Sequence, residues 1–216
     1  MSLALDANLP PPRRAMCARC LRPQQGCICG LVAPVAAQVE LLLLQHPLEL
    51  AQAKGSARLL HMCLPGSVLV TGEAFAPAQL AALLGAGGRV PVLLYPDTPD
   101  AKALGLPAPP ALEPALLRTP ARLRLVVLDG TWRKSRKMLY LNPLLQQLPR
   151  LALTQVPASR YGIRKAHRPD QLSTLEASCY ALMQVECDEA RFAPVIAAFD
   201  AFVARQARHQ GGAATE

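Results

Sequence analysis

The sequence predicts an α/β fold with a mainly parallel sheet flanked by helices. Short apolar runs with strand character alternate along the chain with segments of helical spacing, and such alternation is typical of a layered fold with parallel strands. The first run, residues 39–44, is apolar at almost every position, as in a strand that is covered on both faces. Apolar residues make up 51% of the 216 residues, so one domain can bury a sizeable core.

The other elements follow from local patterns. Four further apolar, β-rich runs are expected to be strands: residues 67–71, 90–94, 123–128 and 151–156. Five segments with helical spacing are expected to be helices: residues 48–62, 77–84, 131–148, 173–187 and 189–209. Proline removes a backbone donor, so Asn142-Pro143 should break the third of these helices. Two long connections remain: a Pro- and Ala-rich stretch at 97–120, with at most one short helix, and an Arg- and Lys-rich loop at 159–170.

Three of the expected strands end in polar or turn-forming residues. These strand ends are Gln45-His46-Pro47, Tyr95-Pro96-Asp97 and Asp129-Gly130-Thr131. Open parallel sheets bind their ligands beyond the carboxyl ends of the strands, so we expect the functional site at this edge.

The composition also bounds the partners and the compartment. The net charge is +8 and the pI about 9.4, which favours a polyanionic partner such as nucleic acid, although a merely basic soluble protein has the same balance. The N-terminus lacks a basic segment followed by an apolar run, and residues 39–44 are too short to span a membrane. We therefore expect a cytoplasmic protein with no membrane partner and mostly reduced cysteines.

Four cysteines crowd into a short segment near the N-terminus, as Cys17-x-x-Cys20 followed by Cys27-x-Cys29. A Cys-x-x-Cys turn brings two thiolates to one metal, and four thiolates suit tetrahedral zinc in a closed structural site. Unligated or redox-active cysteines are the alternative. We therefore predict an N-terminal tail and zinc module at residues 1–35 and a catalytic domain at residues 36–216. The remaining cysteines lie in apolar helical contexts and are expected in the core: Cys63, Cys179 and Cys187.

Two short basic segments are candidates for phosphate contacts with RNA. The first holds Arg133, Lys134, Arg136 and Lys137, and the second holds Arg160, Arg164, Lys165, His167 and Arg168. A further group of arginines surrounds the cysteines: Arg13, Arg14, Arg19 and Arg22. These four either contact the RNA backbone or balance the charge of a zinc–thiolate centre.

Asp129-Gly130-Thr131-Trp132 follows an expected strand and opens an expected helix. The Asp129 carboxylate is placed to reach a ligand, and Gly130 allows a close backbone approach. Thr131 can cap the helix, whose N-terminus attracts anions such as an amino-acid carboxylate. A capped turn with Trp132 in the core explains the same four residues.

This segment resembles the signature of the DTW-domain family, which is named for those residues. The resemblance continues in the cysteine cluster and in four further segments: Leu44-Gln45-His46-Pro47-Leu48-Glu49, Leu94-Tyr95-Pro96, Ser159-Arg160-Tyr161-x-Ile163-Arg164-Lys165 and Ser173-Thr174-x-Glu176-Ala177. The resemblance implies a tRNA-uridine aminocarboxypropyltransferase. Such an enzyme transfers the 3-amino-3-carboxypropyl group of S-adenosylmethionine to uridine N3 in tRNA and releases methylthioadenosine. The resemblance also implies a fold related to the knotted SPOUT methyltransferases.

The resemblance assigns roles to individual residues. The expected catalytic residues are Asp129, Thr131 and Trp132, and the expected cofactor-binding residues are Leu94, Tyr95, Pro96, Gly130, Thr174 and Glu176. A neutral uridine N3 is a poor nucleophile, so Asp129 is either a general base or an anchor for the cofactor. Ser173-x-x-Glu176 is most simply a capping box.

Two alternatives remain open at the level of the sequence. A SPOUT-type RNA methyltransferase would use the same cofactor but transfer its methyl group. A non-catalytic, zinc-containing RNA-binding protein would explain the charge and the cysteines, but it leaves the Asp-Gly-Thr-Trp segment without a role.

Overall fold

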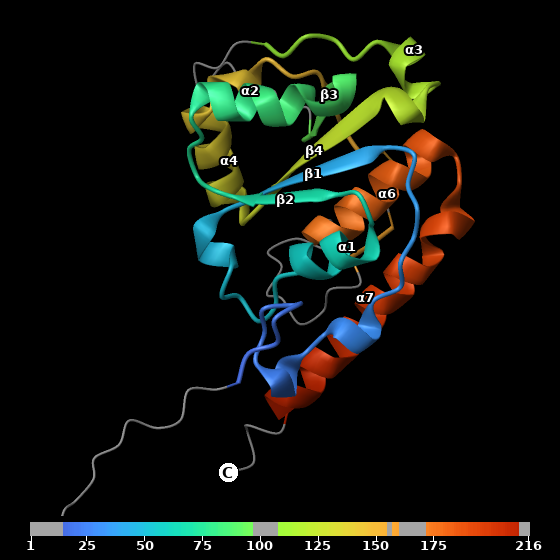
Figure 1. Ribbon diagram of the computed structural model, residues 1–216. Coiled ribbons are helices and arrows are strands. Elements are labelled where there is room, and N and C mark those ends of the chain that lie inside the picture. The colour runs from blue at the N-terminus through green and yellow to red at the C-terminus, as the bar shows by residue number, and fades with distance from the viewer. Residues whose placement is uncertain (1–14, 97–107, 155–156, 160–171, 212–216) are drawn as a thin grey trace, which may run out of the picture.

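The computed structural model describes residues 15–96, 108–154, 157–159 and 172–211. Within this part of the chain, five parallel strands form one sheet in the order β2-β1-β4-β3-β5 (Figure 1). The strands are β1 (Glu40–Gln45), β2 (Val68–Thr71), β3 (Val90–Leu94), β4 (Leu123–Asp129) and β5 (Arg150–Leu151). The predicted α/β fold with a parallel sheet is confirmed.

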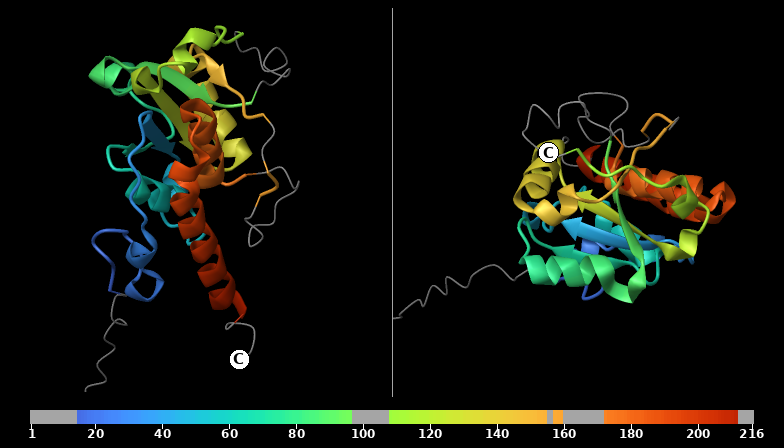
Figure 2. Two further views of the ribbon diagram at one scale, coloured as in Figure 1. Left: turned by 90° about the vertical axis from the view of Figure 1, so that its right-hand side faces the viewer. Right: turned by 90° about the horizontal axis from the view of Figure 1, so that it is seen from above.

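Helices cover both faces of the sheet (Figure 1 and Figure 2). One face carries α1 (Ala57–Cys63), α6 (Thr174–Glu186) and α7 (Glu189–Gly211), and the other carries α2 (Pro77–Gly85), α4 (Trp132–Leu141) and α5 (Pro143–Gln146). Short turns lie in the connections: η1 (Gln24–Gly26), η2 (Cys29–Leu31), η3 (Pro47–Glu49), η4 (Ala86–Gly88), α3 (Pro114–Leu117) and η6 (Pro120–Arg122). None of the described helices combines the length and apolar character needed to cross a membrane.

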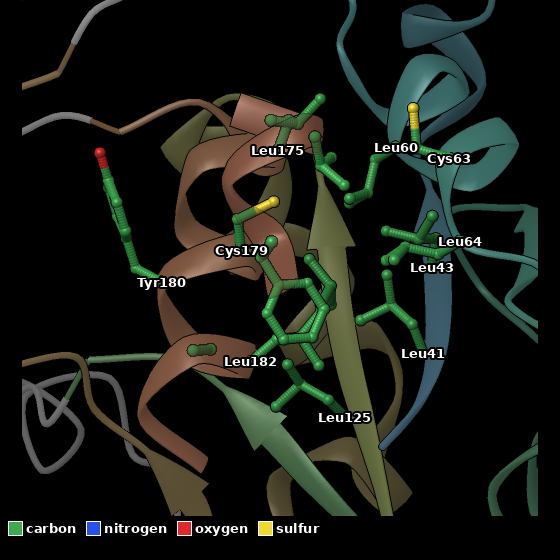
Figure 3. Packing of buried hydrophobic residues seen from close by; sticks show 14 of the residues in the cluster. Leu41, Leu43, Leu60, Cys63, Leu64, Leu125, Leu175, Cys179, Tyr180 and Leu182 are labelled. Carbon is green, nitrogen blue, oxygen red and sulfur yellow. The ribbon is translucent and has the colours of Figure 1, made fainter. Parts of the chain in front are cut away.

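Alternate residues of β1 enter two separate cores, because successive side chains of a strand point to opposite faces. Leu41 and Leu43 pack on the side of α1 and α6, whereas Leu42 and Leu44 pack on the side of α2 and α4. Figure 3 shows Leu41, Leu43 and Leu125 pointing from the strands towards side chains of α6. Full burial of each leucine stabilises the fold by roughly 1.5–3 kcal/mol, so the two cores hold the strand ends firmly in place.

The helix expected at 48–62 is shorter than predicted. Residues of η3 form a 3-10 turn, and the α-helix begins only at Ala57. The intervening carbonyls are taken by a distant side chain: Arg22 Nη1 donates to Ala53 O at 2.6 Å, and Nη2 donates to Gly55 O at 2.7 Å. Helix spacing alone did not reveal this partner, which comes from the cysteine-rich segment.

The fifth strand is also shorter than the predicted 151–156. It pairs only with β3, through Leu93 with Arg150 and Leu94 with Leu151. Leu93 N donates to Pro149 O at 2.9 Å and Tyr95 N donates to Leu151 O at 3.2 Å, and these two bonds form the described part of the ladder. Residues 155–156 lie outside the described residues.

The break at Asn142-Pro143 is confirmed, since α4 ends at Leu141 and α5 begins at Pro143. The Asn142 side chain closes the break: its Nδ2 donates to Met138 O at 2.6 Å, and its Oδ1 accepts from the Phe75 backbone at 2.9 Å. The helical hydrogen bond that Pro143 cannot make, to Leu139 O, is replaced by Gln146 Nε2, which donates to that oxygen at 2.9 Å.

The three isolated cysteines have different surroundings. Cys63 and Cys179 are fully buried, as predicted. Cys187 is exposed, so the prediction of a core position is wrong. Cys187 ends α6 in the left-handed conformation with a φ of 51°, and this reversal turns it out of the buried face of the helix.

Candidate active site and metal centre

The carboxylate of Asp129 lies at the carboxyl end of the central strand β4. Asp129 is paired in register with Gln45, the last residue of β1. Gln45 Nε2 donates to Asp129 Oδ2 at 2.9 Å, and Thr174 Oγ1, from the first residue of α6, donates to Oδ1 at 2.7 Å. Asp129 is only 4% exposed. Three elements therefore meet at one oriented carboxylate at the sheet edge predicted to hold the site.

Gln45 was not among the predicted site residues, although it lies in the segment that resembles the family. The available indication was its place as the polar last residue of an apolar strand. Such a buried glutamine, 4% exposed, needs a polar partner. Asp129 supplies that partner from 84 residues away.

The loop after β4 is tight and starts α4. A side chain at Gly130 would meet Lys134 Cβ at 3.1 Å and His46 Cβ at 3.6 Å, so a larger residue would force its neighbours to move. Thr131 is the N-cap, as predicted, and its Oγ1 accepts from the Lys134 backbone at 3.4 Å. Ser135 Oγ donates to Thr131 O at 3.1 Å.

The end of β3 brings an aromatic pair to the same edge. The Tyr95 and Trp132 rings form an edge-to-face contact with centroids 6.0 Å apart and planes at 78°. Tyr95 is 6% exposed, whereas Trp132 is 50% exposed, so Trp132 is not a core residue. Burial raises the pKa of Tyr95, which keeps its phenol protonated at neutral pH. The predicted cofactor residues Leu94 and Pro96 are half-buried on either side of Tyr95.

Glu176 belongs to the capping box of α6, as predicted. Its Oε2 accepts from the Ser173 backbone at 2.8 Å, and Ser173 Oγ accepts from the Glu176 backbone at 3.2 Å. Ser159 Oγ adds contacts to both carboxylate oxygens, at 2.9 and 3.1 Å. Glu176 is fully buried, and its capping hydrogen bonds fix the start of α6 next to Thr174. Direct contact between Glu176 and a cofactor stays a prediction.

Three further polar residues beside the site were not predicted: His46, Glu49 and Glu73. His46 Nδ1 accepts from the Leu48 backbone at 3.1 Å, so the ring hydrogen is on Nε2 and is directed to Glu73 Oε1 at 2.8 Å. Hydrogen bonds from Lys137 and then from His46 lower the pKa of Glu73. His46 and Glu49 lie in the Leu44–Glu49 family segment, whereas nothing in the sequence marked Glu73.

The first basic segment divides into two kinds of side chain. Lys134 Nζ lies 2.7 Å from Glu49 Oε1, and Lys137 Nζ lies 3.0 Å from Glu73 Oε2. Arg133 and Arg136 are exposed and make no ion pair within the part of the chain that the structure describes. The predicted residues of the second segment lie outside the described residues: Arg160, Arg164, Lys165, His167 and Arg168.

The four N-terminal cysteines form a compact cluster in which all the sulfur atoms lie within 4.8 Å of one another. Cys17 Sγ is 3.6 Å from Cys29 Sγ, and Cys20 Sγ is 3.7 Å from Cys27 Sγ. Tetrahedral zinc with Zn–S bonds of about 2.3 Å requires sulfur separations of about 3.8 Å. Backbone N–H groups of Cys20 and Arg19 lower the pKa of Cys17 to about 6, whereas burial raises the pKa of Cys29 to about 12. Cys17 is therefore the readier of the two to act as a thiolate ligand. The cluster can therefore hold a metal.

The segment that carries the four cysteines lies beside α7 (Figure 1). Cys20 and Ile28 belong to the same core cluster as β1 and α6. Arg205 of α7 donates to the carbonyl oxygens of Cys27 and Gln25. Arg22, which holds the loop before α1, lies over the Phe202 ring at 5.0 Å. Arg22 therefore contacts both the loop before α1 and an aromatic ring of α7.

Comparison with known proteins identifies the family. A family model for the DTW domain matches residues 14–207. The tRNA-uridine aminocarboxypropyltransferase 2 of Macaca fascicularis is 29% identical over 185 residues, which cover 82% of this chain and 58% of the relative. The proteins of the same name from Mus musculus and Drosophila melanogaster are both 31% identical, over 81% of this chain and over 57% and 69% of the respective relatives.

The chain thus spans somewhat more than half the length of the two mammalian relatives. No solved structure matches it with significant similarity. The family model covers both the cysteine cluster and the Asp129 site, which are joined by one core. The chain belongs to the DTW-domain family.

Proposed function

We propose that this protein is an S-adenosylmethionine-dependent tRNA-uridine aminocarboxypropyltransferase. The observation that carries the proposal is the buried Asp129 carboxylate, which is held by Gln45 and Thr174 from two other family segments. Relatives with this activity in their names match most of the chain. A protein that only bound RNA would have no use for an oriented, buried carboxylate at the ligand-binding edge of a parallel sheet.

The reaction joins uridine N3 to the γ-carbon of the methionine moiety. The new C–N bond forms as the C–S bond breaks, the sulfonium takes the electron pair, and methylthioadenosine leaves. The N3 proton must be lost in the same process. S-adenosylmethionine supplies the electrophilic carbon, so the protein has to orient the reactants and accept or direct one proton.

Asp129 fits two roles in this reaction. As a base it would accept the N3 proton, and as an anchor it would bind the ammonium or the ribose hydroxyls of the cofactor. Gln45 and Thr174 each donate to a different oxygen of the carboxylate, so the direction of both oxygens is fixed. Either role requires the fixed orientation that these two donors supply.

The start of α4 offers a complementary site for the carboxylate of the cofactor. Thr131 caps one backbone donor, and the helix dipole favours a negative charge at this end. Lys134 and His46 fill the space that a side chain at Gly130 would need. The cofactor would then lie between the ends of β4 and β3, beside Tyr95 and Pro96.

The tRNA would approach from the exposed side of α4. Arg133 and Arg136 are exposed there, while Lys134 and Lys137 are ion-paired with protein carboxylates. The two arginines are therefore the proposed phosphate contacts within the described residues, and the second basic segment would add more.

The metal at the cysteine cluster would be zinc in a structural role. Four cysteine thiolates complete a tetrahedron and leave no open position for substrate. Zinc would hold the N-terminal segment in the shape that Arg205 and Arg22 bind.

We also propose that the core is of the SPOUT type and knotted. The family resemblance supports this, together with the return of the chain from β5 at the sheet edge to α6, which packs on the central strand β4. The connecting residues 160–171 lie outside the described residues. An experimental structure that traces them decides the point, and an unthreaded connection would contradict the proposal.

The deciding experiment is incubation with tRNA and S-adenosylmethionine labelled either in the methyl group or in the aminocarboxypropyl group. Nucleoside mass analysis should find a uridine carrying the aminocarboxypropyl label, with methylthioadenosine as the stoichiometric by-product. Transfer of the methyl label, with S-adenosylhomocysteine as by-product, would instead identify a methyltransferase. No transfer of either label with tRNA that lacks the modification would reject the enzyme.

A further inference from the structure

Trp132 occupies an unusual position for the only tryptophan of the chain. It is the first residue of α4, three residues after Asp129, and half of its surface is exposed. A large aromatic ring exposed beside a ligand site offers a flat surface on which a planar ligand can stack. The DTW signature thus places a half-exposed indole at the mouth of the proposed active site.

The indole is held in one orientation before any ligand arrives. Tyr95 contacts it edge to face at 6.0 Å, and Tyr95 itself is buried. The backbone of Tyr95 donates to Leu151 O at 3.2 Å, and the Arg150 guanidinium lies 5.3 Å from the centre of its ring. Trp132 therefore loses little conformational freedom when a planar ligand stacks on it.

A cation lies on the same side of α4. Arg136 follows Trp132 by four residues, which places both on one helix face. Burial raises the pKa of Tyr95, and the positive charges of Arg150 and Arg136 oppose that rise, so Arg136 lies near the aromatic pair. Lys134 and Lys137 point instead to carboxylates on the side of β1 and β2.

We infer that Trp132 is a stacking platform for a nucleobase and that Arg136 binds the phosphate or the negative charge attached to it. An aromatic face beside a mobile cation is the usual combination for binding one unstacked nucleotide. The base comes either from the tRNA substrate or from the adenine of S-adenosylmethionine. The choice of these two ligands rests on the proposed function, whereas stacking on Trp132 can be measured without catalysis.

Because the chain has a single tryptophan, its fluorescence reports on this position alone. The full-length protein is titrated with tRNA or oligouridylate in one arm, and with S-adenosylmethionine or methylthioadenosine in the other. Binding constants are measured in parallel by calorimetry for the wild type, Trp132→Phe and Trp132→Leu. Tyr140→Leu is the matched control, since Tyr140 is a 65% exposed aromatic residue on the same helix.

The expected result is quenching of Trp132 by one class of ligand. Loss of one base–aromatic stack weakens binding of that ligand by about tenfold or more. Trp132→Leu should show this loss, Trp132→Phe should retain most of the affinity, and Tyr140→Leu should bind normally. Quenching by RNA alone assigns the subsite to a tRNA base, and quenching by the small molecules alone assigns it to the adenine.

Unchanged fluorescence with all ligands, together with normal affinity of Trp132→Leu, would overturn the inference. If that variant still transfers the aminocarboxypropyl group, the proposed function stands and only the stacking fails. If quenching occurs but no transfer is found with any tRNA, the stacking subsite stands and the proposed reaction fails. Equal losses in Trp132→Phe and Trp132→Leu would also count against stacking, because a phenyl ring preserves the π-face.

Discussion

Gln45 and Asp129 end two neighbouring strands of the sheet, β1 and β4, side by side, and the Gln45 amide donates to the Asp129 carboxylate at 2.9 Å. The amide donor fixes where the oxygens of the carboxylate point. Because the register of the parallel sheet places the two residues side by side, it also sets the orientation of the Asp129 carboxylate.

Gln45→Glu should reduce turnover strongly while keeping the size of the side chain. Two buried carboxylates would then face each other, and one of them would hold a proton because its pKa is raised. A hydrogen bond to a charged group contributes about 1.5–3 kcal/mol, so we expect kcat/KM to fall by roughly 10-fold to 100-fold. Gln52→Glu, at an exposed position, is the control for the added charge. Equal activity of both variants would contradict the positioning role.

Asp129→Asn distinguishes the base from the anchor. The base role predicts a loss of about 10²–10⁴ in kcat with nearly normal cofactor affinity, because the missing interaction belongs to the transition state. Turnover should then recover partly as the pH is raised, since solvent can take the N3 proton. The anchor role predicts weak cofactor binding in calorimetry and little recovery at high pH. Normal turnover and normal binding together would exclude Asp129 from the site.

The cysteine cluster should contain one zinc per chain. Metal analysis of purified protein should find it, and the double variant Cys17→Ser plus Cys20→Ser should lose it. Removal of zinc should also lower the melting temperature of the whole domain, because Cys20 and Ile28 belong to the main core. Cys187→Ser, at an exposed position away from the cluster, is the control. Zinc retained at full occupancy in the double variant would refute the assignment.

Binding of tRNA should weaken steeply with salt, and the two kinds of basic residue should differ. Arg133→Ala plus Arg136→Ala should reduce the slope of log K against log salt by about 0.7–0.9 for each lost phosphate contact. Lys165→Ala should act in the same direction if its loop contacts RNA. Lys137→Ala should change the slope less, because its amine is paired with Glu73. A slope that none of these variants changes would contradict phosphate-led binding.

Glu73 should make part of the stability depend on pH. Lys137 and His46 lower its pKa from the ordinary value of 4.5, so the stabilisation is complete above that value and is lost as the pH falls through the lower folded value. Urea unfolding of Glu73→Gln and the wild type should differ at pH 7 and converge in strong acid. Glu113→Gln, at an exposed acid in a connection, should show no such convergence. A constant difference down to the lowest pH would argue against the ionised pair.

Local chemistry was enough to predict much of this fold. The Asn142-Pro143 break, the Thr131 cap and the capping box of α6 each depend on residues within a few positions of one another. The predicted helix at 48–62 failed for the opposite reason. Arg22 donates to backbone carbonyls of this segment from about thirty residues earlier in the chain. The spacing of apolar residues cannot reveal such a contact.

The same distinction applies to the site. Asp129 and the cysteines were predicted from motifs, because strand ends and Cys-x-x-Cys turns have local signatures. The donors to Asp129 come from positions 84 and 45 residues away, so only the fold brings Gln45 and Thr174 to it. Glu73 ends no motif, and its pairing with His46 and Lys137 depends on where β2 lies in the sheet.

The protein contacts of Arg22 have a wider consequence. Arg22 donates to two carbonyl oxygens of the loop that ends at Ser56. Ser56 Oγ in turn accepts from the Leu175 backbone at 3.3 Å. Leu175 follows Thr174, which donates to Asp129. A series of contacts thus connects the cysteine-rich segment with the Asp129 carboxylate. A chain cut between the predicted segments 1–35 and 36–216 would therefore lose the Arg22 contacts that support the loop beside the proposed site. Oxidation of the four thiols, or removal of the proposed zinc by a chelator, would then impair the proposed activity although neither agent reaches Asp129.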